Sequence, residues 1–270
     1  MRFLSPDERR KLLLKTPQMF SRLIVAGIPI FSLLKKKALI VGAGGLGVIV
    51  AEILARSGIG EMYIIDRDIV REENFNRLGY FREDIGRPKA HALAEKIKHL
   101  RNSKDVPPEF HIKIRSFNVD IVGWDRLEAL IKEADIIFSC LDNEIGRREL
   151  NFLAMKYKKP LIDGATSIDG LNGTIITILP CKTPCYECYY GSDMSVKVNT
   201  VERIGFCDAS LATTMSIVAA LQADQGLKVL LGYKEISHMI KISLFPKLNI
   251  TMLNNVKPRE DCPIHRRFCK

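Results

Sequence analysis

Long apolar runs are missing from this sequence of 270 residues. The longest uncharged apolar stretches cover 38–51 and 209–223, and both are shorter than the roughly 20 residues that a membrane-spanning helix needs. Near the N-terminus, the charged segment from Asp7 to Arg10 occupies the place where a signal peptide would have its apolar core. We therefore expect a soluble, cytoplasmic protein without a membrane partner.

Aromatic residues are also scarce, at 7%, although the chain carries a formal net charge of +10. A basic balance admits nucleic acid or an acidic protein as a partner. The basic residues are spread along the chain, however, with short clusters only at 35–37 and 266–267. No aromatic residues are interleaved with them as a nucleic-acid platform would require, so we do not expect nucleic-acid binding.

The cysteines are seven, an odd number, and most of them lie after residue 180. A chain of this size that folded around disulfides would be expected to carry paired cysteines along its length. The observed distribution favours metal or thiol chemistry in a reducing compartment over a disulfide framework.

What the chain does contain is a globular composition, 47% hydrophobic and 27% charged. Ser5, Pro6 and Glu8 form a capping-box pattern that predicts an N-terminal helix, continued unevenly to about Leu34. Further helices are expected at 48–56, 88–100, 125–132, 147–157 and 210–231. Strands are expected at 38–41, 62–65, 110–119, 136–140, 161–162, 174–179, 239–244 and 248–253.

This alternation of strands and helices is typical of an α/β fold with a doubly wound, mostly parallel Rossmann-like sheet, here extended by antiparallel strands. We divide the chain into an N-terminal helical segment (1–37), a nucleotide-binding core (38–180) and a C-terminal part (181–270). The last part would hold a crossover loop, a helix, a β pair and a metal-binding tail. No internal repeat or low-complexity segment interrupts this pattern.

A glycine-rich loop follows the first predicted core strand and opens a helix. Gly42, Gly44, Gly45 and Gly47 have the spacing that lets a backbone approach a phosphate, and the helix N-terminus adds free N–H groups. Asp66 ends the next strand about 20 residues later, where a ribose-binding acid is expected. These features predict a nucleotide site but do not distinguish NAD, FAD and ATP.

Two cations follow that a dehydrogenase does not need. Arg77 and Lys89 are expected in the same crevice as the glycine loop, where they could stabilise charge on the phosphates of a nucleoside triphosphate. Asp142 and Asn143 end another parallel strand, so that Asp142 can hold Mg²⁺. The combination favours an enzyme that splits ATP.

Cys185 and Cys188 have the spacing of a tetrahedral metal knuckle. Their partners would come from the tail, where Cys262 is followed by His265 and Cys269. Either His265 or Cys269 can be the fourth ligand of a closed, structural zinc site.

Cys207 precedes a predicted helix. A thiol at a helix N-terminus has a lowered pKa and is a plausible nucleophile. The neighbouring carboxylate of Asp208 acts in the opposite direction and raises the pKa of a thiol. The residues alone therefore leave Cys207 as either a nucleophile or a buried helix-cap thiol.

Taken in order, these motifs resemble the ThiF/MoeB/HesA family of adenylating enzymes, which are related to ubiquitin-activating enzymes. The likeness extends from Arg22 to the C-terminal cysteines. The motifs that carry it are the glycine loop, Asp66 and Asp68, Asn74 and Arg77, Pro88 and Lys89, Asp142 and Asn143, and Cys185 and Cys188.

The resemblance implies that ATP binds with Mg²⁺, and that the C-terminal glycine of a ubiquitin-like or sulfur-carrier protein attacks the α-phosphate. It implies these roles: phosphate cradle for Gly44 and Gly45, ribose contact for Asp66, phosphate contacts for Asn74, Arg77 and Lys89, and metal binding for Asp142. It also implies a homodimer in which Arg22 reaches the site of the second subunit.

The same resemblance favours four thiolate zinc ligands, with Cys269 as the fourth. Around Cys207, the sequence resembles the branch of the family that activates the ubiquitin-fold modifier, which implies a thioester on Cys207 after adenylation. A thiol-transfer or sulfur-donor partner would then be a separate chain.

Other functions remain open at this point. An NAD- or FAD-dependent oxidoreductase could use the same glycine loop, but it leaves Arg77, Lys89 and the metal cysteines unexplained. A catalytically silent nucleotide-binding partner is disfavoured by the intact Arg77, Lys89 and Asp142. Adenylation of a small-molecule or tRNA-base carboxylate is the third alternative.

Overall fold

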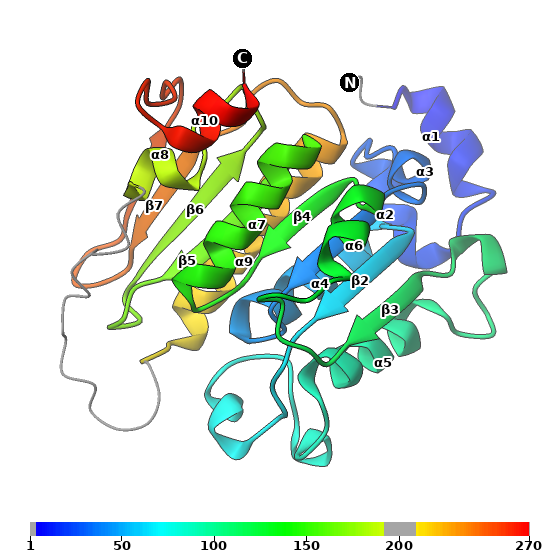
Figure 1. The fold of residues 1–270 in the computed structure, drawn as a ribbon. Helices are drawn as coiled ribbons and strands as arrows, with labels where there is room; N and C mark the ends of the chain where they lie inside the picture. Colours follow the sequence, from blue (N-terminus) through cyan, green and yellow to red (C-terminus); the bar gives the residue numbers. More distant parts are fainter. Residues whose placement is uncertain (1–3, 192–208, 270) are drawn as a thin grey trace.

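A computed structural model describes residues 4–191 and 209–269 of the chain. Its centre is one eight-stranded sheet in the order β3-β2-β1-β4-β5-β6-β7-β8 (Figure 1). The strands are β1 (Lys37–Val41), β2 (Glu61–Ile65), β3 (Lys113–Phe117), β4 (Ile136–Ser139), β5 (Leu161–Thr166), β6 (Asn172–Ile178), β7 (Met239–Ser243) and β8 (Asn249–Leu253). The five strands from β3 to β5 pair in parallel, and β6, β7 and β8 add antiparallel pairs. The predicted α/β class, with a parallel sheet and an antiparallel extension, is confirmed.

Helices cover both faces of the sheet (Figure 1). They are α4 (Gly45–Ser57), α5 (Lys89–Arg101), α6 (Leu127–Glu133), α7 (Glu144–Tyr157) and α9 (Ala212–Leu230). Because side chains alternate along a strand, Ala38 and Ile40 pack under α4, α5 and α9, whereas Leu39 and Val41 pack under α6 and α7. The continuous apolar run of β1 is thus explained by burial on both faces.

The N-terminal segment forms short helices α1 (Pro6–Leu13), α2 (Ser21–Val25) and α3 (Ile30–Leu33), with a 3₁₀ turn over Gln18–Phe20. The predicted capping box is present, because the Ser5 and Glu8 side chains each bond the other's backbone N–H. Phe20, Ile24 and Ile30 pack with Phe110 in a separate apolar cluster. Since β1 begins only a few residues after α3, this cluster lies at the amino ends of the parallel strands (Figure 1).

Several expected elements differ in their limits by a few residues. The strand predicted at 110–119 is shorter, because Pro108–Phe110 forms a 3₁₀ turn before β3. Further short 3₁₀ turns cover Glu72–Asn76 and Arg82–Asp84. The helix expected at 210–231 begins at Ala212, so that Leu211 lies just before it and is exposed.

The C-terminal part does not form a separate body. Strands β7 and β8 continue the sheet of the core, and α9 packs on α4, β5 and β6. Two short helices, α8 (Tyr186–Tyr190) and α10 (Pro263–Phe268), lie beside one another next to α7 (Figure 1). In the described ranges, none of the helices combines the length and apolar character needed to cross a membrane.

Candidate active site

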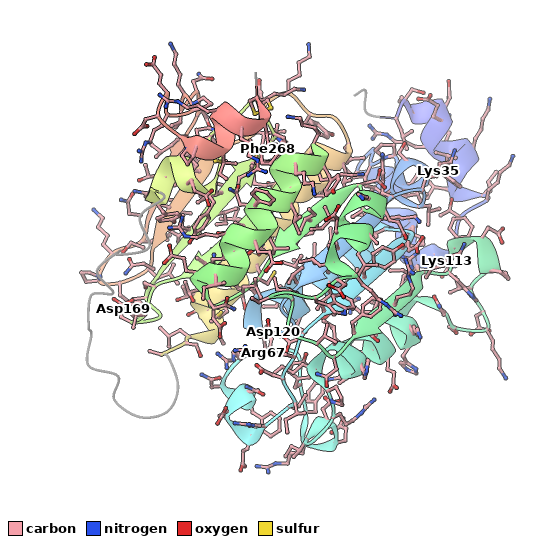
Figure 2. All side chains as sticks on the ribbon, in the orientation of Figure 1. Lys35, Arg67, Lys113, Asp120, Asp169 and Phe268 are labelled. Carbon is pink, nitrogen blue, oxygen red and sulfur yellow. A yellow bond between two sulfur atoms is a disulfide. The ribbon has the colours of Figure 1, made fainter. Side chains whose placement is uncertain are left out.

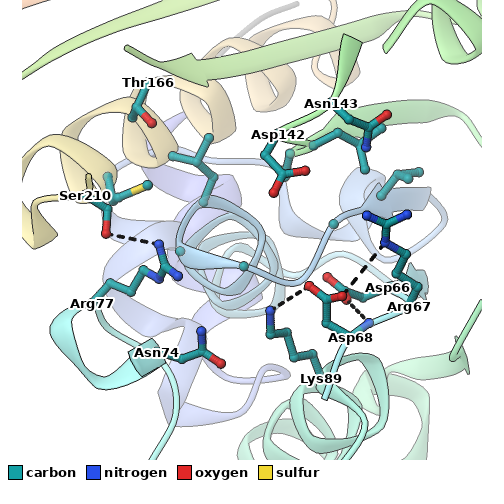
Figure 3. Close-up of a pocket in the computed structure, with 18 of the residues that line it drawn as sticks. Asp66, Arg67, Asp68, Asn74, Arg77, Lys89, Asp142, Asn143, Thr166 and Ser210 are labelled. Carbon is teal, nitrogen blue, oxygen red and sulfur yellow. Dashed lines mark hydrogen bonds and ion pairs between the residues drawn. The ribbon is translucent and has the colours of Figure 1, made fainter. Parts of the chain in front are cut away.

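A pocket of about 540 Å³ lies at the carboxyl ends of β1, β2 and β4 (Figure 3). The strand order reverses here, because β1 has β2 on one side and β4 on the other. Such switch points leave a crevice that is the usual ligand site of doubly wound sheets. Most of the residues predicted from sequence line this pocket: Gly42, Gly44, Gly45, Asp66, Asp68, Asn74, Arg77, Lys89, Asp142 and Asn143.

The glycine loop has the predicted strand-to-helix geometry. Gly42 has a φ of +96°, a conformation that other residues rarely adopt. Gly47 does not line the pocket. A Cβ there would lie 1.8 Å from the carbonyl oxygen of Gly42, so the absence of a side chain at Gly47 allows the first turn of α4 to pack closely against the end of β1. Gly44, by contrast, would meet nothing within 4 Å. Its open side is available for a ligand.

Asp66 is positioned by the backbone around it. Its carboxylate accepts hydrogen bonds from the N–H groups of Ala43 (2.6 Å) and Asp68 (2.7 Å). Desolvation by burial raises the pKa of Asp66, and the two backbone donors act against this shift. The carboxylate therefore ties the glycine loop to the end of β2.

The first of the two predicted cations is already paired. Lys89 is buried at the start of α5, and its Nζ lies 3.0 Å from a carboxylate oxygen of Asp68. Next to it, Arg67 pairs with Asp120 at 2.7 Å (Figure 2). The charge of Lys89 in the pocket is thus partly neutralised by Asp68.

The second cation has no acidic partner in the described ranges. Arg77 donates from Nη1 to the hydroxyl of Ser210 at 3.0 Å (Figure 3). Asn74 is buried nearby, where its side-chain oxygen accepts from the N–H of Arg71 at 2.9 Å. Arg77 is therefore the cation whose positive charge is most available to an anion in the pocket.

Asp142 faces the pocket from the loop after β4 and is exposed. Asn143 caps α7, because its side chain accepts from the N–H of Gly146 at 2.8 Å. Sequence reasoning missed Arg147, which lines the pocket and donates to the carbonyl of Leu141. A cation in the first turn of a helix opposes the helix dipole, and that signal could have drawn attention to Arg147.

Arg147 is held by a buried ion pair. Its Nη1 lies 2.6 Å from Asp163 of β5, and its Nη2 also contacts the carbonyl of Gly164 at 3.1 Å. Burial raises the pKa of Asp163, and the Arg147 charge acts against that shift. The pair therefore fixes the backbone on which Asp142 sits.

Two predicted residues are not in this pocket. Arg22 is exposed on α2, at the amino ends of the strands and thus at the opposite end of the sheet. Cys207 lies outside the described residues. Within this chain, the structure brings together the nucleotide-binding candidates but not Arg22.

A second cluster joins α8 to α10. The sulfur of Cys185 lies 3.7 Å from that of Cys188 and 3.6 Å from that of Cys262. A ring nitrogen of His265 lies within 4.8 Å of the Cys185 and Cys188 sulfurs, and its buried Nε2 has no hydrogen-bond partner. Three sulfurs and one unpartnered imidazole nitrogen are the donor set of a closed tetrahedral zinc site.

Cys269, favoured above as the fourth ligand, is placed differently. Its sulfur is bonded to that of Cys181, next to the ammonium group of Lys158. Helix α10 spans Pro263–Phe268, so that His265 turns inward while Cys269 lies beyond the helix end. His265, the alternative fourth ligand, thus lies with the cysteine cluster, and Cys269 lies outside it in a disulfide, a bond that the cysteine count did not favour.

Two curated proteins of the same name are similar to this chain in sequence. Ubiquitin-like modifier-activating enzyme 5 of Caenorhabditis briggsae is 30% identical over 241 residues, which cover 84% of this chain and 53% of that protein. The protein of the same name in Dictyostelium discoideum is 28% identical over 246 residues, which cover 86% of this chain and 61% of that protein. The chain thus spans little more than half the length of these relatives.

Among solved structures, E. coli MccB with ATP has a TM-score of 0.73 at 22% identity, over 94% of this chain and 79% of that one. This likeness shows a shared fold. The ThiF family itself matches residues 26–264, a range that includes the pocket, the described glycine loop and the cysteine cluster up to Ile264. On this match and on the order of its motifs, the chain belongs to the ThiF family.

Proposed function

We propose that this protein catalyses ATP-dependent adenylation of the C-terminal glycine of a ubiquitin-like or sulfur-carrier protein. The observation that carries the proposal is the cation Arg77, which faces the glycine loop without an acidic partner in the described ranges. Hydride transfer builds no charge on phosphate oxygens, whereas phosphate transfer from ATP does, and such a cation stabilises that charge. The family membership and the named relatives support the same reaction class.

The reaction would proceed as one displacement. A carboxylate oxygen of the terminal glycine attacks the α-phosphorus of ATP, the new acyl–phosphate bond forms, and the bond to the β-phosphate breaks and releases pyrophosphate. The glycine loop and the start of α4 supply N–H groups to the phosphates. Arg77 and Lys89 offset the negative charge, with Asp68 holding the Lys89 ammonium group in place.

The carboxylate of Asp142 suits Mg²⁺, which prefers oxygen ligands and binds together with substrate phosphates. Asp142 is exposed at the pocket rim, and Arg147 fixes the preceding carbonyl. When bound, the ion would neutralise phosphate charge. The role of the chain is to hold Asp142 at a fixed position on the rim.

Further parts of the proposal concern the remaining candidates. Cys207 would attack the acyl-adenylate as a thiolate, forming a thioester and releasing AMP. Cys185, Cys188, Cys262 and His265 would hold a structural zinc ion that joins α8 to α10. A homodimer would let Arg22 of one chain reach the pocket of the other, since it lies far from the pocket of its own chain.

The test is ATP–pyrophosphate exchange, measured with each small glycine-ended carrier protein of the same organism. Exchange should depend on one carrier and on Arg77, so that Arg77→Ala removes it. A conjugate that reductant cleaves should form with the wild type and be missing with Cys207→Ala, although exchange persists. If no carrier supports exchange while the protein binds ATP, the proposed acceptor is wrong.

A further inference from the structure

Ser210 connects two parts of the chain that are far apart in sequence. The side-chain amide of Asn76 donates to the Ser210 hydroxyl at 2.8 Å and to the Ser210 carbonyl at 3.1 Å. Arg77 donates to the same hydroxyl at 3.0 Å. One serine before α9 therefore receives three hydrogen bonds from two consecutive residues near the pocket.

The aliphatic stem of Arg77 is confined as well. A methyl group at Gly45 would lie 2.9 Å from Cδ of Arg77 and 3.2 Å from the sulfur of Met215. The stem thus passes over the glycine loop beside α9, and its guanidinium end meets Ser210. Packing therefore fixes the path of the Arg77 side chain, and the Ser210 hydroxyl fixes the orientation of its guanidinium group.

The chemistry of this contact differs from that of Lys89. Asp68 holds the Lys89 ammonium group with a negative charge. A hydroxyl orients a guanidinium without cancelling its charge, and among the described residues only one of the five N–H donors of Arg77 is used. The rest remain available for the planar, bidentate contacts that arginine makes with phosphate.

The Ser210 hydroxyl accepts two hydrogen bonds and, within the described residues, donates none. A serine oxygen accepts through two lone pairs, and Asn76 and Arg77 occupy both. Its own hydrogen has no acceptor in the ranges 4–191 and 209–269 that the structure describes, and Ser210 lines the pocket. The contacts that the structure shows for this oxygen are thus those that hold Asn76 and Arg77.

We propose that Ser210 is a positioning residue: it turns the Arg77 guanidinium toward the phosphates of the bound nucleotide, and Asn76 holds Ser210 in place. This inference rests on the proposed function, since it assumes that the pocket binds ATP. Ser210 would contribute to ATP binding only by orienting Arg77. The inference predicts that changes at Ser210 matter only when Arg77 is present.

The experiment is a double-mutant cycle of Ser210→Ala and Arg77→Ala, read first as binding by calorimetry. Ser210→Ala should weaken ATP binding by about tenfold, the effect of one charge-assisted hydrogen bond, and leave adenosine binding unchanged. It should have no further effect once Arg77 is alanine. Ser210→Thr, which keeps the hydroxyl, should restore ATP binding, and Asn76→Ala should reproduce part of the loss.

Ser216→Ala is the matched control, because Ser216 lies on α9, the helix that follows Ser210, and bonds only the carbonyl of Ala212 among the described residues. It should bind ATP like the wild type. If the wild type binds ATP, two results would overturn the inference. One is that Ser210→Ala weakens ATP binding equally with and without Arg77, and the other is that it weakens ATP binding in neither background. A wild type that binds no ATP would refute the proposed function itself. In ATP–pyrophosphate exchange, Ser210→Ala should likewise lower kcat when Arg77 is present and have no further effect when Arg77 is alanine.

Discussion

Two glycines of the phosphate loop should respond to alanine in opposite ways, although they lie only three residues apart. Gly44 is the N-cap of α4 and partly exposed, with a φ of −81° that any residue can adopt. Gly47 lies in the first turn of the same helix and is buried. Packing within the protein requires glycine at position 47, whereas only a bound ligand would require glycine at position 44.

For Gly47→Ala, helix propensity alone predicts a gain, since alanine is about 1 kcal/mol better than glycine in a helix. The added Cβ, however, would lie 1.8 Å from the carbonyl oxygen of Gly42, which is backbone and cannot turn away. Overpacking of this kind costs about 3 kcal/mol or more. We expect a net loss of about 2 kcal/mol, which lowers the Tm of a chain of this size by about 4–8 °C.

For Gly44→Ala, nothing lies within 4 Å of the added Cβ. Alanine is about 0.5–1 kcal/mol worse than glycine as an N-cap, and a lower entropy of the unfolded chain offsets a similar amount. The free energy of unfolding should therefore change by less than about 1 kcal/mol. ATP binding should nevertheless weaken tenfold or more, because the added methyl group would keep the phosphate away from the backbone N–H groups. Losing one charge-assisted hydrogen bond in this way costs about 1.5–3 kcal/mol.

Calorimetric ATP titration and thermal unfolding of both variants test this reasoning. The expected outcome is a stable Gly44→Ala protein with weak ATP binding and a destabilised Gly47→Ala protein. A Gly44→Ala protein with wild-type affinity would show that the phosphates do not approach this loop. A Gly47→Ala protein more stable than the wild type would show that the helix can shift away from β1.

Three further outcomes are expected. His265→Ala should lose zinc, about one ion per chain in the wild type, whereas Cys269→Ser should keep it in elemental analysis; the reverse result would restore Cys269 as the ligand. Because desolvation raises the pKa of Cys140 to about 12, iodoacetamide at pH 8 should leave Cys140 unmodified in native protein, and mass spectrometry showing native labelling would contradict that. Mixed dimers of Arg22→Ala and Asp142→Ala chains should regain pyrophosphate exchange, and confirmed mixed dimers without activity would exclude an arginine shared across the interface.

The nucleotide pocket was largely predictable because its signals are local. The β1 run, the glycine loop and the cap of α4 are contiguous, and parallel strands place their carboxyl ends at one edge. Asp66 and Asp142 follow from that rule alone. The pairing of Lys89 with Asp68 did not, since a contact between side chains depends on how α5 packs.

The contacts that were missed join separate elements of the fold. Arg77 meets Ser210 across more than 130 residues, and Arg147 of α7 meets Asp163 of β5. The choice between the two candidate fourth ligands was open for a different reason. Counting residues after Cys262 leaves His265 and Cys269 equally acceptable, and only the inward turn of α10 separates them.

The bonds of Asp66 to the N–H groups of Ala43 and Asp68 have a thermodynamic consequence. They order the loop before any nucleotide arrives, so that the entropy cost of ordering this wall of the pocket falls on folding rather than on binding. A ligand that meets a preorganised wall loses less of its interaction free energy to loop ordering. For this side of the pocket, nucleotide association should therefore consist of a single encounter step, without a slow rearrangement of the loop that follows β1.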